Sequence, residues 1–299
     1  MSSNIHYQNC PLCGSGNIRH YLHAKDNTVT QQQFPIWQCL DCTGMFTQDV
    51  PDEQSIGRYY RSDAYISHTN TKEGLINSLY HRVRNITLEQ KRKTIFSVTG
   101  QRNGSLLDIG AGVGAFAHHM QESGWNVTAL EPDATARNNA KLDFGITLQD
   151  PSKLFQLPPA SFDAITMWHV LEHVHRLHEY IEQCKLLLKP NGALIIAVPN
   201  FTSKDAQHYQ QYWAAYDVPR HLYHFSPDSM KKLMLKHGMR VEKMNPMWYD
   251  SFYVSLLSEK YRTGKQNLVN GFRNGLSSNL TAFTKRTMAS SLVYIIRKG

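Results

Sequence analysis

Short apolar runs alternate with amphipathic stretches from residue 105 to the end of the chain. This alternation is typical of a parallel sheet whose two faces are covered by helices. It predicts an α/β fold with a doubly wound, mostly parallel seven-stranded sheet of the Rossmann-like kind. The expected strands lie near residues 105–109, 126–131, 145–148, 162–168, 192–198, 239–244 and 291–297.

Three segments depart from this alternation. Residues 1–50 are short polar and aromatic stretches around four cysteines, with a core too small to fold without a metal. Residues 51–100 end in a basic run with helical spacing, which predicts a helical linker. Residues 247–290 are too long for an ordinary connection between the last two strands, so we expect a helical insertion there.

Composition places the chain among globular proteins. It has 299 residues, of which 41% are hydrophobic, enough for a substantial core in one large or two smaller domains. The first residues contain no apolar signal region, and nowhere do 18 apolar residues run together. We therefore expect a cytoplasmic protein without a membrane span.

Positive charge is concentrated at the C-terminal end. Lysine and arginine exceed aspartate and glutamate by 8 in the whole chain, and residues 251–299 hold eight basic residues against the single acid Glu259. The eight are Lys260, Arg262, Lys265, Arg273, Lys285, Arg286, Arg297 and Lys298. Such a segment is either a solvated helix face or a surface for phosphates or anionic lipid.

Four of the five cysteines form two C-x-x-C pairs, Cys10 with Cys13 and Cys39 with Cys42. Each pair can turn two thiolates toward one point, and two pairs complete a tetrahedral zinc site. A chain without a secretion signal is not expected to form disulfides, and redox chemistry needs only one pair. With four sulfur ligands the zinc is structural, because no coordination position stays open. Cys184 lies in an apolar helical pattern and is expected in the core.

A glycine-rich turn follows the first strand of the α/β region, in the stretch LLDIGAGVG at 106–114. Glycine lets the backbone come within contact distance of a ligand. The spacing G-x-G-x-G differs from the dinucleotide pattern G-x-G-x-x-G. Asp108 before the turn disfavours a pyrophosphate and suits a cationic or hydrogen-bond-donating group.

The next strand ends at Glu131, 17 residues after Gly114. A carboxylate at this strand end is placed to accept both hydroxyls of a ribose. Together with the turn at Asp108, it predicts a nucleoside-binding site.

At this point the chain resembles the class I S-adenosylmethionine-dependent methyltransferases over about residues 104–245. The resemblance rests on LLDIGAGVGAF, ALEPD and FDAITMWHVLEHV. It implies S-adenosylmethionine as cofactor, with the ribose held by Glu131. It also implies that the methionine part is held by Asp108, Gly110, Ala111, Gly112 and Gly114, that the adenine side is formed by Pro132, Asp133 and Asp150, and that Trp168 and His169 line the cofactor.

The cysteine-rich block is similar in layout to sugar C-methyltransferases with an N-terminal zinc-binding domain, although the chain lacks their long C-terminal domain. This leaves the acceptor and the methylated atom open. The resulting domain layout is a zinc-ribbon-like domain at 1–50, a helical linker at 51–100, an S-adenosylmethionine-binding core at 101–246 with an acceptor loop at 200–225, and a helical lid or interface segment plus a final strand at 247–299.

Three histidines are candidate catalytic residues, although a general base is needed only for a hydroxyl or carbon acid. His169 follows the fourth strand at the edge where doubly wound sheets bind ligands, or its ring packs against adenine. His173 follows one helical turn later and either points inward or caps a helix. His221 belongs to the loop described next.

The loop at 200–225 is rich in aromatic residues and charge. Tyr212 and Trp213 suit stacking on an acceptor. Asp217, Arg220 and His221 either bind the acceptor or form a buried salt bridge that holds the loop. After the loop, Ser226-Pro227 predicts a helix start, and Gly238 its end.

The sequence thus predicts a methyltransferase acting on a small molecule such as a sugar or a polysaccharide or lipid precursor. The alternative is a zinc-ribbon RNA methyltransferase, but residues 10–42 contain only Arg19 and Lys25 against Asp26 and Asp41, which does not favour nucleic acid. A cofactor-binding regulator is a third interpretation. The apolar stripe within 247–290 serves a lid or a homodimer contact equally well.

Overall fold

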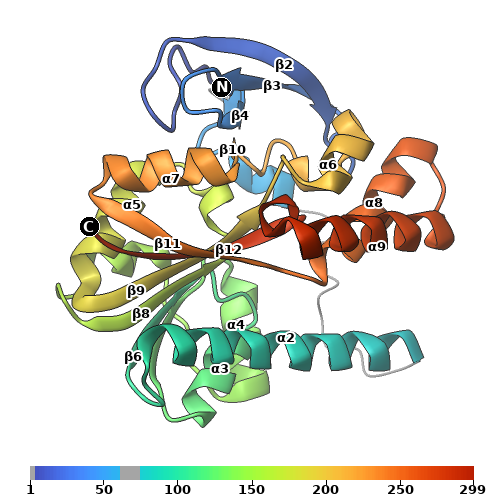
Figure 1. Ribbon diagram of the computed structural model, residues 1–299. Coiled ribbons are helices and arrows are strands. Elements are labelled where there is room, and N and C mark those ends of the chain that lie inside the picture. The colour runs from blue at the N-terminus through green and yellow to red at the C-terminus, as the bar shows by residue number, and fades with distance from the viewer. Residues whose placement is uncertain (1–3, 61–74) are drawn as a thin grey trace.

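A twisted six-stranded sheet forms the centre of the computed structural model, which describes residues 4–60 and 75–299 (Figure 1). Part of the helical linker expected at 51–100, namely 61–74, lies outside these residues. Strand order is β11-β12-β9-β8-β6-β7, in which β6, β7, β8 and β9 run parallel and β12 runs antiparallel to both of its neighbours, β9 and β11. The strands are β6 (Ser105–Ile109), β7 (Asn126–Leu130), β8 (Phe162–Trp168), β9 (Leu188–Pro199), β11 (Met239–Pro246) and β12 (Ser291–Lys298).

The α/β fold class is confirmed, but the sheet has six strands where the pattern predicts seven. The expected strand at 145–148 is wrong: this segment makes a single bridge, between Leu130 and Gln149. The preceding helix ends at Gly145, and Asp150 caps the turn that follows. Between these two ends only Gln149 pairs with β7: its amide donates to the Ala129 carbonyl at 2.9 Å, and its carbonyl accepts from the Glu131 amide at 2.9 Å.

Helices cover both faces of the sheet, with α2 and α3 on one side and α5 and α7 on the other (Figure 1). Their bounds are α2 (Leu75–Thr99), α3 (Ala115–Glu122), α4 (Ala134–Phe144), α5 (Leu177–Leu187) and α7 (Pro227–Lys236). Adjacent strand residues enter different cores: Leu106 packs with α2 and α3, and Leu107 packs with α5 and α7. Burial of both faces explains why the central strands read as continuous apolar runs.

Helix α7 begins as the sequence predicts. Ser226 caps it, because its hydroxyl oxygen accepts a hydrogen bond from the Ser229 amide. In return the Ser229 hydroxyl oxygen accepts one from the Ser226 amide, and Pro227 occupies the first turn.

The cysteine-rich block forms a four-stranded antiparallel sheet whose order is β10-β4-β3-β2. Three of its strands are β2 (Ile18–Lys25), β3 (Gln33–Cys39) and β4 (Met45–Thr47), and a separate short pair joins β1 (Asn4–Ile5) to β5 (Val50–Pro51). The fourth strand, β10 (Tyr223–His224), belongs to the loop at 200–225. The block therefore shares a sheet with the expected acceptor loop.

Two helices, α8 (Asp250–Thr263) and α9 (Leu268–Thr284), form a hairpin between β11 and β12 and extend past the sheet (Figure 1). The helical insertion predicted for 247–290 is present. The two helices approach closely at glycines, since a Cβ on Gly275 would lie 2.9 Å from Phe252 Cα.

Asp205 holds the hairpin to the rest of the molecule. It lies on α6 (Lys204–Tyr209), is almost fully buried and accepts three hydrogen bonds. The donors are Ser278 Oγ of α9 at 2.7 Å, Trp213 Nε1 at 2.8 Å and Ser290 Oγ at 2.7 Å. One carboxylate thus joins α6, α9, the 200–225 loop and the start of β12.

We predict that Asp205→Ala lowers the free energy of unfolding by about 3 kcal/mol, because three buried donors lose a charged acceptor. The control Ser278→Ala removes one donor and is expected to cost about 1 kcal/mol. Urea unfolding followed by circular dichroism measures both. A loss for Asp205→Ala no larger than that of the control would contradict this account.

Candidate functional site

The glycine-rich turn lies at the carboxyl end of β6, and all three of its glycines have left-handed backbone angles: φ is 74° at Gly110, 56° at Gly112 and 77° at Gly114. Gly110 faces the interior, since a Cβ there would lie 2.3 Å from Val170 Cγ2. A Cβ on Gly112 would meet no atom within 4 Å. The turn therefore presents an open backbone face at Gly112 and packs inward at Gly110.

Glu131, at the end of β7, lies against this turn. Its carboxylate accepts hydrogen bonds from the amides of Gly112, at 2.7 Å, and Asp133, at 2.9 Å. Burial raises the pKa of Glu131, against the effect of these two donors. Each oxygen keeps a further lone pair for another donor.

The neighbouring acidic residues shape the loop after β7. Asp133 caps α4 by accepting from the Ala136 amide at 2.7 Å, and Asp150 caps the 3-10 turn η2 (Pro151–Gln156). Arg137 donates to the carbonyls of Glu131, at 2.6 Å, and Pro132, at 2.8 Å. Adenine contacts by Pro132, Asp133 and Asp150 stay a prediction.

Asp108 is buried beneath the turn, where Thr166 Oγ1 donates to it at 2.7 Å. Burial raises the pKa of Asp108 to about 6, against the hydrogen bond from Thr166 and the nearby charge of Lys91. Lys91 is a residue that sequence reasoning missed. Its ammonium lies 4.5 Å from the centroid of the Trp168 ring, and burial lowers its pKa.

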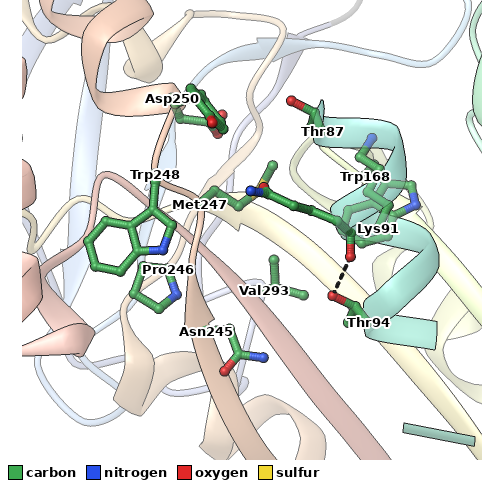
Figure 2. A pocket seen from close by; sticks show the side chains of 12 residues that line it. Thr87, Lys91, Thr94, Trp168, Asn245, Pro246, Met247, Trp248, Asp250 and Val293 are labelled. Carbon is green, nitrogen blue, oxygen red and sulfur yellow. Dashed lines mark hydrogen bonds between the residues drawn. The ribbon is translucent and has the colours of Figure 1, made fainter. Parts of the chain in front are cut away.

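The ammonium of Lys91 projects from α2 between Trp168 and the segment that joins β11 to α8 (Figure 2). No hydrogen bond or ion pair to it is found among the described residues. The surrounding pocket has a volume of about 80 Å³ and is lined by α2, the end of β8 and residues 245–250. Lys91 has no local signal in the sequence, because it stands in an ordinary basic helical run.

His169 follows β8 with a left-handed φ of 57°. Its Nε2 lies 3.0 Å from Asp250 Oδ2, and its Nδ1 lies 3.5 Å from Glu172 Oε1. Burial opposes a charged ring, but the two carboxylates prevail and raise the pKa of His169 to about 10. The ring is therefore an imidazolium at neutral pH, a form that cannot accept a proton.

Glu172, His173 and His221 form a second cluster, in which one ligand atom of each residue lies within 4.8 Å of the others. Glu172 is fully buried, and neither carboxylate oxygen has a hydrogen-bond partner among the described residues. Sequence reasoning missed Glu172. An acid inside the apolar stretch VLEHV was the available signal.

The two histidine rings are oriented by backbone carbonyls. Nδ1 of His173 lies 3.0 Å from the Arg220 carbonyl, and Nδ1 of His221 lies 2.9 Å from the Ala215 carbonyl. Because a carbonyl only accepts, each Nδ1 carries the proton and Nε2 is the acceptor in a neutral ring. Nε2 of His221 lies 3.7 Å from Asp217 Oδ2, so the carboxylate can stabilise that ring once it is protonated. Burial, followed by the proximity of His173, keeps the pKa of His221 well below its usual value. The cluster is thus a set of converging acceptors that can hold a proton or a cation.

The 200–225 loop differs in part from expectation. Trp213 is only 2% exposed and donates its indole N–H to Asp205, so the prediction that it stacks on an acceptor is wrong. Tyr212 remains 39% exposed. Asp217 forms an ion pair with the buried Arg220, as the salt-bridge alternative requires. Acceptor binding by Tyr212, Asp217, Arg220 and His221 stays a prediction.

The four paired cysteines converge on one point. Sγ of Cys10 lies 3.6 Å from that of Cys42, and Sγ of Cys13 lies 3.6 Å from that of Cys39. A tetrahedral zinc ion with Zn–S bonds of about 2.3 Å requires sulfur separations of about 3.8 Å. The four thiols therefore fit a closed zinc site, whereas Cys184 is buried apart from them.

Comparison with known proteins gives a family. The family model described as "Methyltransferase domain" matches residues 80–244. A ubiquinone biosynthesis O-methyltransferase of Nitrosococcus oceani is 28% identical over 64% of this chain and 82% of its own. That of Caulobacter vibrioides is 33% identical over 33% of this chain and 42% of its own, so this match spans less than half of the relative.

Among solved structures, a putative sarcosine dimethylglycine methyltransferase from Galdieria sulphuraria is similar with a TM-score of 0.52 and 17% sequence identity. The match covers 73% of this chain and 88% of that one. At this level of identity the likeness supports the fold.

We predict one zinc ion per chain, bound by the four paired cysteines. Cys39→Ser is expected to lose the metal and lower the temperature at which the N-terminal block unfolds, because the block has little core of its own. Native mass spectrometry and thermal unfolding measure the two effects, with Cys184→Ala as the control that retains zinc. Freshly purified, reduced protein without metal would refute the site.

We predict a pH-dependent stabilisation by the pair of His169 and Asp250. Because the folded pKa of His169 is raised, this stabilisation is complete below about pH 6.5 and fades as the pH rises toward 10. The excess stability of the wild type over Asp250→Asn is therefore expected to shrink with rising pH. By NMR the His169 ring stays protonated at pH 8 in the wild type and titrates lower in the variant.

The control Asp228→Asn removes the same charge from an exposed carboxylate and leaves the His169 titration unchanged. Titration of wild-type His169 below pH 7 would show that the pair does not hold the proton.

Proposed function

The chain belongs to the family of methyltransferase domains, and from this membership we propose that it transfers a methyl group from S-adenosylmethionine to a small-molecule acceptor. The cofactor supplies a sulfonium-activated methyl group, whose transfer is an in-line displacement. The protein then contributes mainly by aligning acceptor and methyl group. The observation that carries this proposal is the open backbone face of Gly112 beside the carboxylate of Glu131.

The residues of the turn complement the parts of the proposed cofactor. The free lone pairs of Glu131 suit two ribose hydroxyls, and the open face at Gly112 admits the chain that joins ribose to methionine. The methionine part carries a carboxylate and an ammonium group. Lys91, whose ammonium makes no hydrogen bond or ion pair among the described side chains although Asp108 and Asp250 are near, suits the carboxylate, and Asp108 suits the ammonium or sulfonium charge.

We further propose a hydroxyl-bearing acceptor, such as a sugar or a polysaccharide or lipid precursor. The naming of the relatives as O-methyltransferases supports oxygen, and the layout similar to sugar enzymes supports a saccharide. A hydroxyl requires a general base, and the neutral His221 with His173 and Glu172 is suited to accept its proton. His169 is held as an imidazolium and so does not serve as the base. Its ion pair with Asp250 instead positions the start of α8 beside the site.

Two segments complete the proposed acceptor side. The cysteine block, a zinc-ribbon-like domain at 1–50, positions His221 through the pairing of β4 with β10. The segment at 247–299 acts as a lid, because Asp250 at the start of α8 reaches His169. In this proposal the expected linker at 51–100 contributes to the cofactor site through α2, which places Lys91 there.

We predict that Glu131→Gln weakens S-adenosylmethionine binding by about 1–3 kcal/mol, or roughly 5- to 150-fold, because one charged acceptor for the ribose is lost. Isothermal titration calorimetry measures this affinity. The control Glu122→Gln changes an exposed carboxylate of α3 and leaves binding unchanged. Equal affinities for Glu131→Gln and the wild type would remove Glu131 from the cofactor site.

The acceptor is tested by transfer of a tritiated methyl group from labelled S-adenosylmethionine into fractions of host nucleotide sugars, lipid-linked intermediates and RNA. Label in a sugar or lipid-linked fraction supports the proposal. Label in RNA alone would overturn it in favour of the nucleic-acid alternative. Absence of label from all fractions, with cofactor binding intact, would favour a cofactor-binding regulator.

A further inference from the structure

Helix α9 is packed in the reverse of the usual amphipathic manner. Its buried residues are small: Gly271, Gly275, Ser278 and Ala282. Its large apolar residues are exposed, namely Leu268 (65%), Val269 (78%), Phe272 (57%), Leu276 (43%), Leu280 (64%) and Phe283 (79%). These six residues are called the α9 stripe below.

The α9 stripe is continuous. At about 100° per residue, its six side chains fall within an arc of about 120°, and the helix is about 25 Å long. Elsewhere in the described chain, exposed large apolar side chains are scattered over other elements. An apolar surface gathered on one helix face in this way marks an interaction site.

The neighbouring helix does not cover the stripe. Helix α8 turns small or polar residues inward, among them Ser251, Ser255 and Ser258. Phe252 of α8 stacks on Phe272 at 5.0 Å, yet Phe272 stays more than half exposed. The hairpin therefore satisfies its own packing with small residues and leaves the large apolar ones outward.

The charges around the stripe indicate which kind of partner it binds, a second copy of the chain or an anionic surface. Six basic residues stand on the hairpin and the residues that follow it: Lys260, Arg262, Lys265, Arg273, Lys285 and Arg286. The two acids of the hairpin are engaged, Asp250 with His169 and the buried Glu259 with Arg262, so Arg262 is neutralised and the other five basic residues carry the charge. A twofold dimer would bring identical basic patches together and repel, whereas an anionic lipid surface attracts them.

We propose that the α9 stripe docks the protein on an anionic membrane surface. The helix lies in the plane of the headgroups, with its apolar side chains below them and its arginines and lysines at the phosphates. No helix of the described residues is long and apolar enough to cross a membrane, so the attachment is peripheral. The proposal goes beyond methyl transfer and is testable without it.

The test is co-sedimentation of the full chain with vesicles of phosphatidylglycerol and phosphatidylcholine, compared with vesicles of phosphatidylcholine alone. The wild type is expected to bind the anionic vesicles, and more weakly as salt rises. The double variant Val269→Ser with Phe283→Ser is expected to lower the partition coefficient at least about tenfold. Because both side chains are more than three-quarters exposed, folding should be unaffected.

Two controls separate the alternatives. Leu142→Ser with Leu235→Ser removes two exposed apolar side chains from α4 and α7 and should leave vesicle binding unchanged. Light scattering reports the oligomeric state of each variant. Absence of binding to anionic vesicles, equal binding to neutral vesicles, or a dimer that dissociates only in the α9 variant would each overturn the proposal.

Discussion

The pairing of β4 with β10 is the interaction on which the arrangement of the site depends. Between α6 and α7 the chain forms two single-turn 3-10 helices, η4 (Gln210–Tyr212) and η5 (Ala214–Tyr216), and the two-residue strand β10, so part of its backbone needs partners from elsewhere. Thr47 of β4 supplies them: its amide donates to the Leu222 carbonyl at 2.9 Å, and its hydroxyl donates to the His221 carbonyl at 2.7 Å. The block folded around the four cysteines thus sets the position of His221.

A chain of charged residues, of which Asp108 and Glu172 are fully buried and the others partly buried, links this loop to the glycine-rich turn. From Asp108 through Lys91, Asp250 and His169 to Glu172, opposite charges alternate across the carboxyl ends of the strands. Burying such groups costs free energy that well-packed apolar side chains would not. A cluster of this kind, with shifted pKa values at a sheet edge, is characteristic of a functional site, and here it lies where the methyltransferase family suggests chemistry.

Local pattern was sufficient for features whose physical cause is local. Short apolar runs predicted six of the seven expected strands, and the Ser226-Pro227 pair predicted the start of α7. The paired cysteines indicated a cluster that the fold does bring together. The strand expected at 145–148 is not formed: pairing with β7 is a contact between separate elements, and only the next residue, Gln149, makes it. The prediction for Trp213 was wrong because the sequence around an aromatic residue in a polar loop does not distinguish a buried ring from an exposed one.

Four features follow from the sequence alone: the fold class, the glycine-rich turn, the place of Glu131 at a strand end, and the cysteine pairs. Each of them depends on the spacing of residues within one strand or one turn. The pairing of His169 with Asp250 does not follow, because the two residues lie 81 positions apart in the chain and meet only after the sheet is assembled. The placement of Lys91 beside Trp168 does not follow either, because α2 and β8 are brought together only by the fold. The direction of the α9 stripe is likewise decided by packing. Its pattern predicts an apolar face, but only the close approach of Gly271 and Gly275 to α8 leaves that face outside.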